Sequence, residues 1–73
     1  MTRLRPITSR ELCKRLKKIG FVIIRQKGSH TFWQHDDGRC TVVPIHRGES
    51  IGKGLFSSIL DDIQLSLEDF ENI

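Results

Sequence analysis

A histidine follows directly after a short Lys-Gly-Ser segment in residues 27–35, which have the sequence KGSHTFWQH. An imidazole has an unperturbed pKa of ~6.5, so it can accept and donate a proton near neutral pH. Cleavage of RNA through the ribose 2′-hydroxyl needs such a group, an acid for the leaving oxygen, and cations for the phosphate charge. His30 is therefore a candidate catalytic residue. The alternative is a solvated imidazole with no role at the end of a turn.

The residues just before His30 have the chemistry to hold the phosphate in such a reaction. Arg25 and Lys27 would supply positive charge to the pentacoordinate phosphorus. Gly28 would let the backbone approach a phosphate closely, and the Ser29 hydroxyl would donate a hydrogen bond to a phosphate oxygen. We predict that these four residues contact the phosphate.

The sequence contains two further histidines, His35 and His46, whose roles must be considered. His46 follows Pro44 beyond the third expected strand, where it could approach His30 as the missing acid. A structural role, such as a hydrogen bond to a loop carbonyl, is an equal alternative. His35 lies five positions after His30 and so faces the other side of a regular strand. We predict that His35 is a surface residue and forms neither a catalytic pair nor a zinc site with His30.

Other kinds of active site find no support. The sequence has no Walker-type phosphate loop, no nucleophile elbow and no HExxH motif. The acid pairs at 36–37 and 61–62 are adjacent and poorly placed to chelate one metal ion. Cys13 and Cys40 form no CxxC pair, and we expect both to be buried, reduced thiols. We predict no metal and no cofactor.

Positive charge is concentrated in the first part of the chain. Residues 1–27 contain nine Lys or Arg and one acid, whereas residues 61–71 contain five acids and no cation. This division of charge predicts a polyanion-binding surface that is separated from the acidic C-terminal segment. The alternative is a soluble surface whose charges are unevenly placed but bind no polyanion. Lys14, Lys17 and Lys18 are the cations that we expect to follow an RNA backbone, unless they form a solvated helix face.

The first helix is predicted to begin at a capping box, Thr8-Ser9-Arg10-Glu11. Leu12, Leu16 and Ile19 then recur at helical spacing, and Gly20 is expected to end the helix.

Three strands are predicted at 21–26, 30–35 and 40–43, rich in β-branched and aromatic residues. Their short connections require an antiparallel meander. Phe32 and Trp33 face opposite sides of one strand, so one should be core and the other exposed, but periodicity does not settle which.

A second helix is predicted at 53–63, with an apolar core stripe from Leu55 to Ile63, and a short last turn at 66–70. The order α-β-β-β-α indicates an α+β fold in which two helices pack on one face of a three-stranded antiparallel sheet. The other face is left to solvent or a ligand.

The length of 73 residues predicts one domain over 1–73. No apolar run approaches the ~20 residues that span a bilayer, so no membrane partner is expected. The first ten residues lack the apolar core of a secretory signal, and we expect a cytoplasmic protein.

From about residue 9 to Phe70 the chain resembles the HicA-type (YcfA-like) mRNA interferase toxins. The resemblance is carried by ELCKRLKKIGFVIIRQKGSHTFW, TVVPIH, KGLFSSIL and LEDF, and most strongly by the block G-F-x-x-x-R-Q-K-G-S-H. It implies a double-stranded-RNA-binding-like fold. It also implies that His30 is the catalytic residue, that a histidine at the P-x-H position of His46 is shared, and that a HicB-type antitoxin covers the active face.

The combined prediction is an endoribonuclease toxin that cleaves mRNA without a metal ion and is inhibited by its antitoxin. One alternative is a non-catalytic RNA-binding module that uses the same basic helix and sheet. Another is an adaptor whose open sheet face binds a protein.

Overall fold

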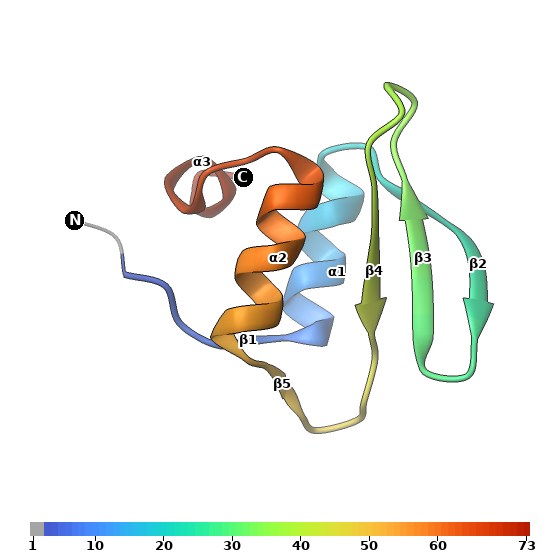
Figure 1. Ribbon diagram of the computed structural model, residues 1–73, viewed down its shortest axis with the longest axis horizontal. Helices are drawn as coiled ribbons and strands as arrows, with labels where there is room; N and C mark the ends of the chain where they lie inside the picture. The colour runs from blue at the N-terminus through green and yellow to red at the C-terminus, as the bar shows by residue number, and fades with distance from the viewer. Residues whose placement is uncertain (1–2) are drawn as a thin grey trace.

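The computed structural model describes residues 3–73 and shows an α+β fold with the predicted α-β-β-β-α order (Figure 1). The elements are β1 (Ile7–Thr8), α1 (Ser9–Lys18), β2 (Val22–Lys27), β3 (His30–Gln34), β4 (Cys40–Pro44), β5 (Ser50–Ile51), α2 (Lys53–Ile63) and α3 (Leu67–Glu71). The predicted bounds of the second helix are confirmed. The strands β1 and β5 were not predicted, because two residues carry no measurable periodicity.

The strands form two antiparallel sheets. One has the order β2-β3-β4, and β1 pairs with β5 in the other. In the larger sheet Trp33 lies opposite Ile23 on one side and Thr41 on the other, while His30 lies between Lys27 and Pro44. The central position of β3 means that both of its neighbours fix the orientation of its side chains.

The helices cover the sheet face that carries Thr31, Trp33, Thr41 and Val43, all of which are buried. In Figure 1 α1 and α2 lie next to β4, and β2 is at the far edge. The apolar side chains that complete the core are Leu12, Leu16, Phe21, Ile51, Phe56, Ile59, Leu60, Ile63 and Phe70. Trp33 is therefore the core residue of the Phe32–Trp33 pair, and Phe32 lies half-buried on the outer face.

The start of α1 is set by Thr8. Its hydroxyl accepts a hydrogen bond from the Glu11 amide at 3.1 Å, as an N-cap should. The Glu11 carboxylate accepts a hydrogen bond from Arg15 at 3.2 Å, and Thr8 pairs with Ser50 in the small sheet. Only the Thr8 half of the predicted capping box therefore forms.

His35 is a structural residue, and the prediction that it lies free on the surface is wrong. Its Nε2 is 3.0 Å from the Ile19 carbonyl oxygen and must carry the proton, because a carbonyl can only accept. Its Nδ1 is 3.1 Å from the Asp37 amide, and its ring packs edge-on against Phe21 at 5.1 Å. His35 thereby joins the end of α1 to the hairpin between β3 and β4.

Gly20 makes this arrangement possible. It ends α1 with φ +97°, and a Cβ at this position would lie 3.0 Å from the Nε2 of His35. Gly38 has nearly the same φ, +99°, but a Cβ there would meet nothing within 4 Å.

We therefore expect Gly20→Ala to destabilise the protein more than Gly38→Ala. Both substitutions place a side chain in the left-handed region, which costs roughly 1–2 kcal/mol. Gly20→Ala should also displace the His35 ring, adding about 1 kcal/mol for a weakened hydrogen bond. Urea unfolding of the two variants measures the difference, and equal midpoints would show that the His35 contact contributes nothing.

Two further expectations are wrong. Leu55 was expected in the core, but 43% of it is exposed; it lies in the first turn of α2, before the buried residues Phe56, Ile59, Leu60 and Ile63. Both cysteines are free thiols as predicted, yet only Cys13 is half-buried. Cys40 is exposed, because it lies opposite Gln34 on the sheet face that the helices leave open.

Candidate active site

The turn before His30 is a two-residue hairpin loop, Gly28-Ser29, between β2 and β3. Gly28 has φ +59°, and the one described non-glycine residue with positive φ is Gln64. A positive φ at the first loop position alone is typical of a type II′ turn, which favours glycine there. The tight turn places Lys27 and His30 directly opposite each other at the end of the ladder.

His30 lies on the outer face of the sheet and is exposed. It alternates with the buried Thr31, so its side chain points away from the helices. Within residues 3–73 its ring takes part in no side-chain hydrogen bond or ion pair, unlike that of His35. Both ring nitrogens are therefore available to a ligand.

The outer face next to His30 is partly aromatic and cationic. Arg25 lies opposite Phe32 in the ladder, and its guanidinium carbon is 4.4 Å from the centre of the Phe32 ring. This cation–π contact holds the Arg25 side chain against the sheet. The Arg25–Phe32 pair lies two pairs along the ladder from Lys27–His30 and therefore on the same face. The structure thus brings Arg25, Lys27 and His30 to one face of one hairpin.

The same region exposes apolar side chains. Val22 and Ile24 are each 58% exposed, Ile23 43% and Val42 37%. They lie on the edge strand β2 and on β4, beyond the reach of the helices. A β-bulge between Ile23 and Arg25 shifts the register of β2 at this point.

The loop between β4 and β5 is tied to the hairpin. The Ile45 amide donates a hydrogen bond to the Ser29 carbonyl at 2.7 Å. His46 follows directly, and its carbonyl accepts a hydrogen bond from the Glu49 amide at 3.2 Å, which closes the loop on itself. The sequence analysis included His46 of this loop as a possible site residue, but not its neighbour Arg47.

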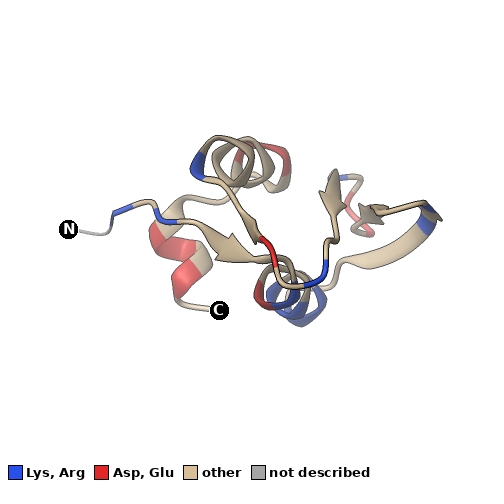
Figure 2. Cartoon of the chain, turned by 90° about the horizontal axis from the view of Figure 1, so that it is seen from below, with Lys and Arg blue, Asp and Glu red and all other residues tan. Residues whose placement is uncertain are grey.

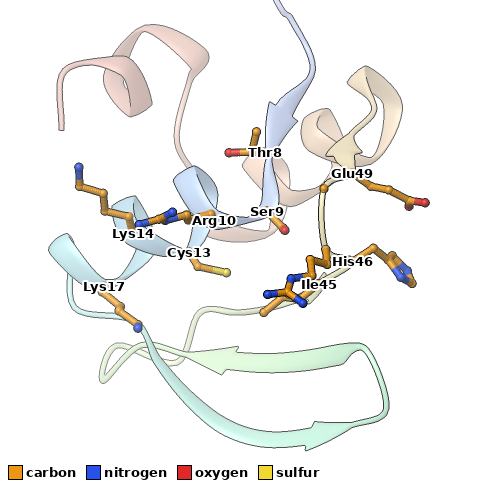
Figure 3. A pocket seen from close by; sticks show the side chains of 11 residues that line it. Thr8, Ser9, Arg10, Cys13, Lys14, Lys17, Ile45, His46 and Glu49 are labelled. Atoms are coloured by element: carbon orange, nitrogen blue, oxygen red, sulfur yellow. The ribbon is translucent and has the colours of Figure 1, made fainter.

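His46 and His30 lie at the same end of the sheet, but no hydrogen bond joins them in the part of the chain that the structure describes. Figure 3 shows the His46 ring on the side of the loop away from α1. It borders a small pocket of about 170 Å³ whose other lining residues include Pro44, Glu49 and Leu55. The structure therefore leaves both roles proposed for His46 open to experiment.

A larger groove of about 1190 Å³ separates α1 from this loop (Figure 3). We name it the basic groove; it is lined by Thr8, Ser9, Arg10, Cys13, Lys14, Lys17, Ile45, His46, Arg47, Gly48 and Glu49. Two of the three predicted lysines, Lys14 and Lys17, lie in it. Lys18 is exposed on the same helix but is not part of the lining.

The other cations of α1 have different positions. Arg10 lines the basic groove, one turn before Lys14. Arg15 faces away from it, donating hydrogen bonds to Glu11 at 3.2 Å and to the Phe70 carbonyl at 3.0 Å. Arg15 therefore anchors α3. Sequence reasoning missed Arg10 and Arg47 as site residues; the spacing of Arg10, Lys14 and Lys17 at i, i+4 and i+7 was the available signal for Arg10.

Cys13 is the thiol in the basic groove. Burial raises the pKa of Cys13, and the nearby Lys17 ammonium partly offsets this. The thiol is therefore protonated near neutral pH and is a poor nucleophile.

Charge is distributed unevenly over the fold. Figure 2 shows the acidic segments of α3 at the opposite end of the molecule from the β2–β3 hairpin, and basic segments of α1 beside the basic segment of the β4–β5 loop.

Within residues 3–73 no three His, Cys, Asp or Glu side chains gather into a group that could hold a metal ion. None of the described helices is long and apolar enough to cross a membrane.

The chain was compared with models of known protein families. Residues 9–65 match the model of the HicA toxin of bacterial toxin–antitoxin systems. The matched segment contains α1, the three-stranded sheet, the β4–β5 loop and α2, and so includes the hairpin and every residue of the basic groove except Thr8. A search among curated proteins found no match.

Proposed function

Because this chain belongs to the HicA toxin family of bacterial toxin–antitoxin systems, we propose that it is an endoribonuclease that cleaves mRNA in the cytoplasm without a metal ion. The catalytic residue in this proposal is His30. The observation that carries it is the position of His30: an exposed imidazole, free of side-chain partners in the described chain, directly after a glycine turn and opposite a lysine.

The proposed reaction is transphosphorylation. His30 accepts the proton of the ribose 2′-hydroxyl, the 2′-oxygen forms a bond to phosphorus, and the bond from phosphorus to the 5′-oxygen breaks. A protonated acid supplies the proton that the leaving 5′-oxygen takes. The products are a 2′,3′-cyclic phosphate and a 5′-hydroxyl. Every step is a proton transfer or a displacement at phosphorus, so the balance requires no redox partner.

The cations beside His30 fit the charge that develops on the phosphate. Lys27 lies opposite His30, and Arg25 is held on the same face by Phe32. Fixed positive groups that already point at the phosphate oxygens stabilise the transition state without reorganisation. The Gly28-Ser29 turn adds a backbone that has no bulky side chain in the way, and Lys14 and Lys17 extend the positive surface along α1.

An antitoxin partner follows from the family. We propose that a HicB-type antitoxin covers the outer face of the sheet and inhibits the enzyme by blocking His30. Val22 and Val42 are exposed on the same face of the sheet as Arg25 and His30, and Ile24 is exposed at the bulge beside Arg25. This combination suits an apolar partner surface with acidic side chains.

The test of the proposed function is cleavage in the presence of a chelator. Purified protein incubated with RNA in excess EDTA is expected to produce fragments that end in a 2′,3′-cyclic phosphate, because proton transfer by histidine needs no metal. Mass spectrometry of the fragment ends identifies the product. Fragments that appear only after addition of a divalent cation, or that end in a 3′-hydroxyl, would contradict the mechanism.

The same incubation separates the enzyme from the non-catalytic alternative. An RNA-binding module would retard RNA in a native gel and leave it intact in EDTA. Retarded but uncut RNA would therefore favour the binding module.

A further inference from the structure

We propose that the basic groove between α1 and the β4–β5 loop binds the phosphate backbone of the RNA strand next to the cleaved nucleotide. This inference rests on the proposed function, since it concerns how the same substrate is held. It adds Arg10 and Arg47 to the binding residues and distinguishes Lys14 and Lys17 from Lys18.

The charge of the groove comes from both of its walls. Arg10, Lys14 and Lys17 lie on one stripe of α1, and Arg47 lies on the loop opposite. None of these four cations takes part in an ion pair within residues 3–73, whose ion pairs involve Arg15, His35 and Arg39. Four free cations against one acid, Glu49, make the groove suited to a chain of negative charges.

The groove is continuous with the hairpin that carries His30. Ile45 lines the groove, and its amide is bonded to the Ser29 carbonyl at 2.7 Å, one residue before His30. A strand whose scissile phosphate lies at His30 on the outer face can pass around this end of the sheet, at the Ile45–Ser29 hydrogen bond, and reach the groove on the helix side. The bond also fixes the groove wall relative to the catalytic imidazole.

The lining indicates that the groove contacts the backbone and not the bases. No Phe or Trp is among the described residues that line it, and the cations that dominate the lining favour phosphates over bases. Its volume of about 1190 Å³ and its open shape suit a strand that passes through, not one enclosed nucleotide. The contribution to binding should therefore be independent of the sequence next to the cleavage site.

Cys13 provides a direct readout of occupancy. It lies in the groove wall, whereas Cys40 is exposed on the outer face of the sheet at the end far from His30. In a Cys40→Ser variant, the rate of modification by a thiol reagent reports on Cys13 alone. A short single-stranded RNA with 2′-O-methyl riboses serves as the probe, since it cannot be cleaved through the 2′-hydroxyl.

We expect this RNA to slow the modification of Cys13 severalfold at concentrations that saturate binding. RNA that binds without slowing the modification would overturn the proposal. Polyglutamate of matched charge is the comparison, because an acidic protein segment is the other polyanion that the groove would attract. Equal protection by both at equal concentration would overturn the assignment to RNA.

Arg47→Gln and Lys18→Gln form a matched pair, because each removes one exposed charge and only Arg47 lines the groove. Arg47→Gln should reduce the slope of log affinity against log salt concentration by about 0.7, the loss of one phosphate contact to a single strand. Lys18→Gln should leave the slope nearly unchanged. Equal slopes for the two variants would contradict the groove.

The outcomes separate this inference from the proposed function. If RNA protects Cys13 but the protein does not cut natural RNA, the proposed nuclease activity is wrong and the proposed binding groove stands. If the protein cuts natural RNA but bound RNA never protects Cys13, the nuclease activity stands and the proposed binding groove is wrong.

Discussion

His30→Ala is expected to abolish RNA cleavage. General acid–base catalysis by one side chain contributes typically 10²–10⁴-fold, and without His30 no other imidazole lies on the hairpin opposite Lys27. The initial rate of fragment formation in EDTA measures the loss. The fold should be unaffected, because the ring is exposed and has no side-chain partner within residues 3–73, and such surface substitutions change stability by about 0.5 kcal/mol or less.

His46→Ala is the matched control, since it removes a second exposed imidazole at the same end of the sheet. A loss comparable to that of His30→Ala would assign the leaving-group acid to His46, and an unchanged rate would assign it a role in the loop. Thermal unfolding of both variants checks that the fold survives. If His30→Ala retained full cleavage, the catalytic assignment would be wrong whatever His46 does.

Trp33→Ala is expected to unfold the protein or leave it barely stable. Trp33 is 1% exposed and lies on the central strand β3, on the sheet face that the helices cover. Loss of a buried aromatic costs about 3–5 kcal/mol through lost burial and the remaining cavity. A chain of this length lies at the low end of the usual range of roughly 5–15 kcal/mol for unfolding. Circular dichroism during thermal unfolding measures the effect.

The cost in Trp33→Ala comes from the cavity and not from a lost polar partner. The indole Nε1–H donates to the Thr31 hydroxyl at 2.8 Å, which itself donates to the Val43 carbonyl at 2.7 Å. After the substitution Thr31 keeps its bond to Val43, so no donor is left buried without an acceptor. Phe32→Ala is the control from the next position: it opens no cavity in the core and should leave a folded protein.

Much of the fold follows from local sequence patterns. The Thr8 cap, the apolar spacing of Leu12 and Leu16, and the left-handed Gly20 determine α1. The short connections determine the antiparallel order of the sheet. The errors concern contacts between elements distant in sequence: His35 bonds to Ile19, and β1 pairs with β5 across some forty residues. No periodicity within one segment carries that information.

The candidate site also has one part that could be predicted from the sequence and another part that depends on the tertiary fold. His30, Lys27 and the Gly28-Ser29 turn are contiguous in sequence, so their proximity was predictable. Arg47 joins Arg10 and Lys14 only because the hydrogen bond between Ile45 and Ser29 holds the β4–β5 loop across from α1. That placement depends on the tertiary fold, and no pattern within α1 could show that Arg47 lies across from it.

The irregularity in β2 has a consequence for the toxin once its antitoxin is gone. An open edge strand with exposed valine and isoleucine is a template for self-association into larger β-aggregates. The extra residue between Ile23 and Arg25 breaks the even spacing of free backbone groups that a second copy would need in order to add on. The nearby Arg25 and Lys27 repel an identical edge. Copies of the toxin released from the antitoxin should therefore stay dispersed.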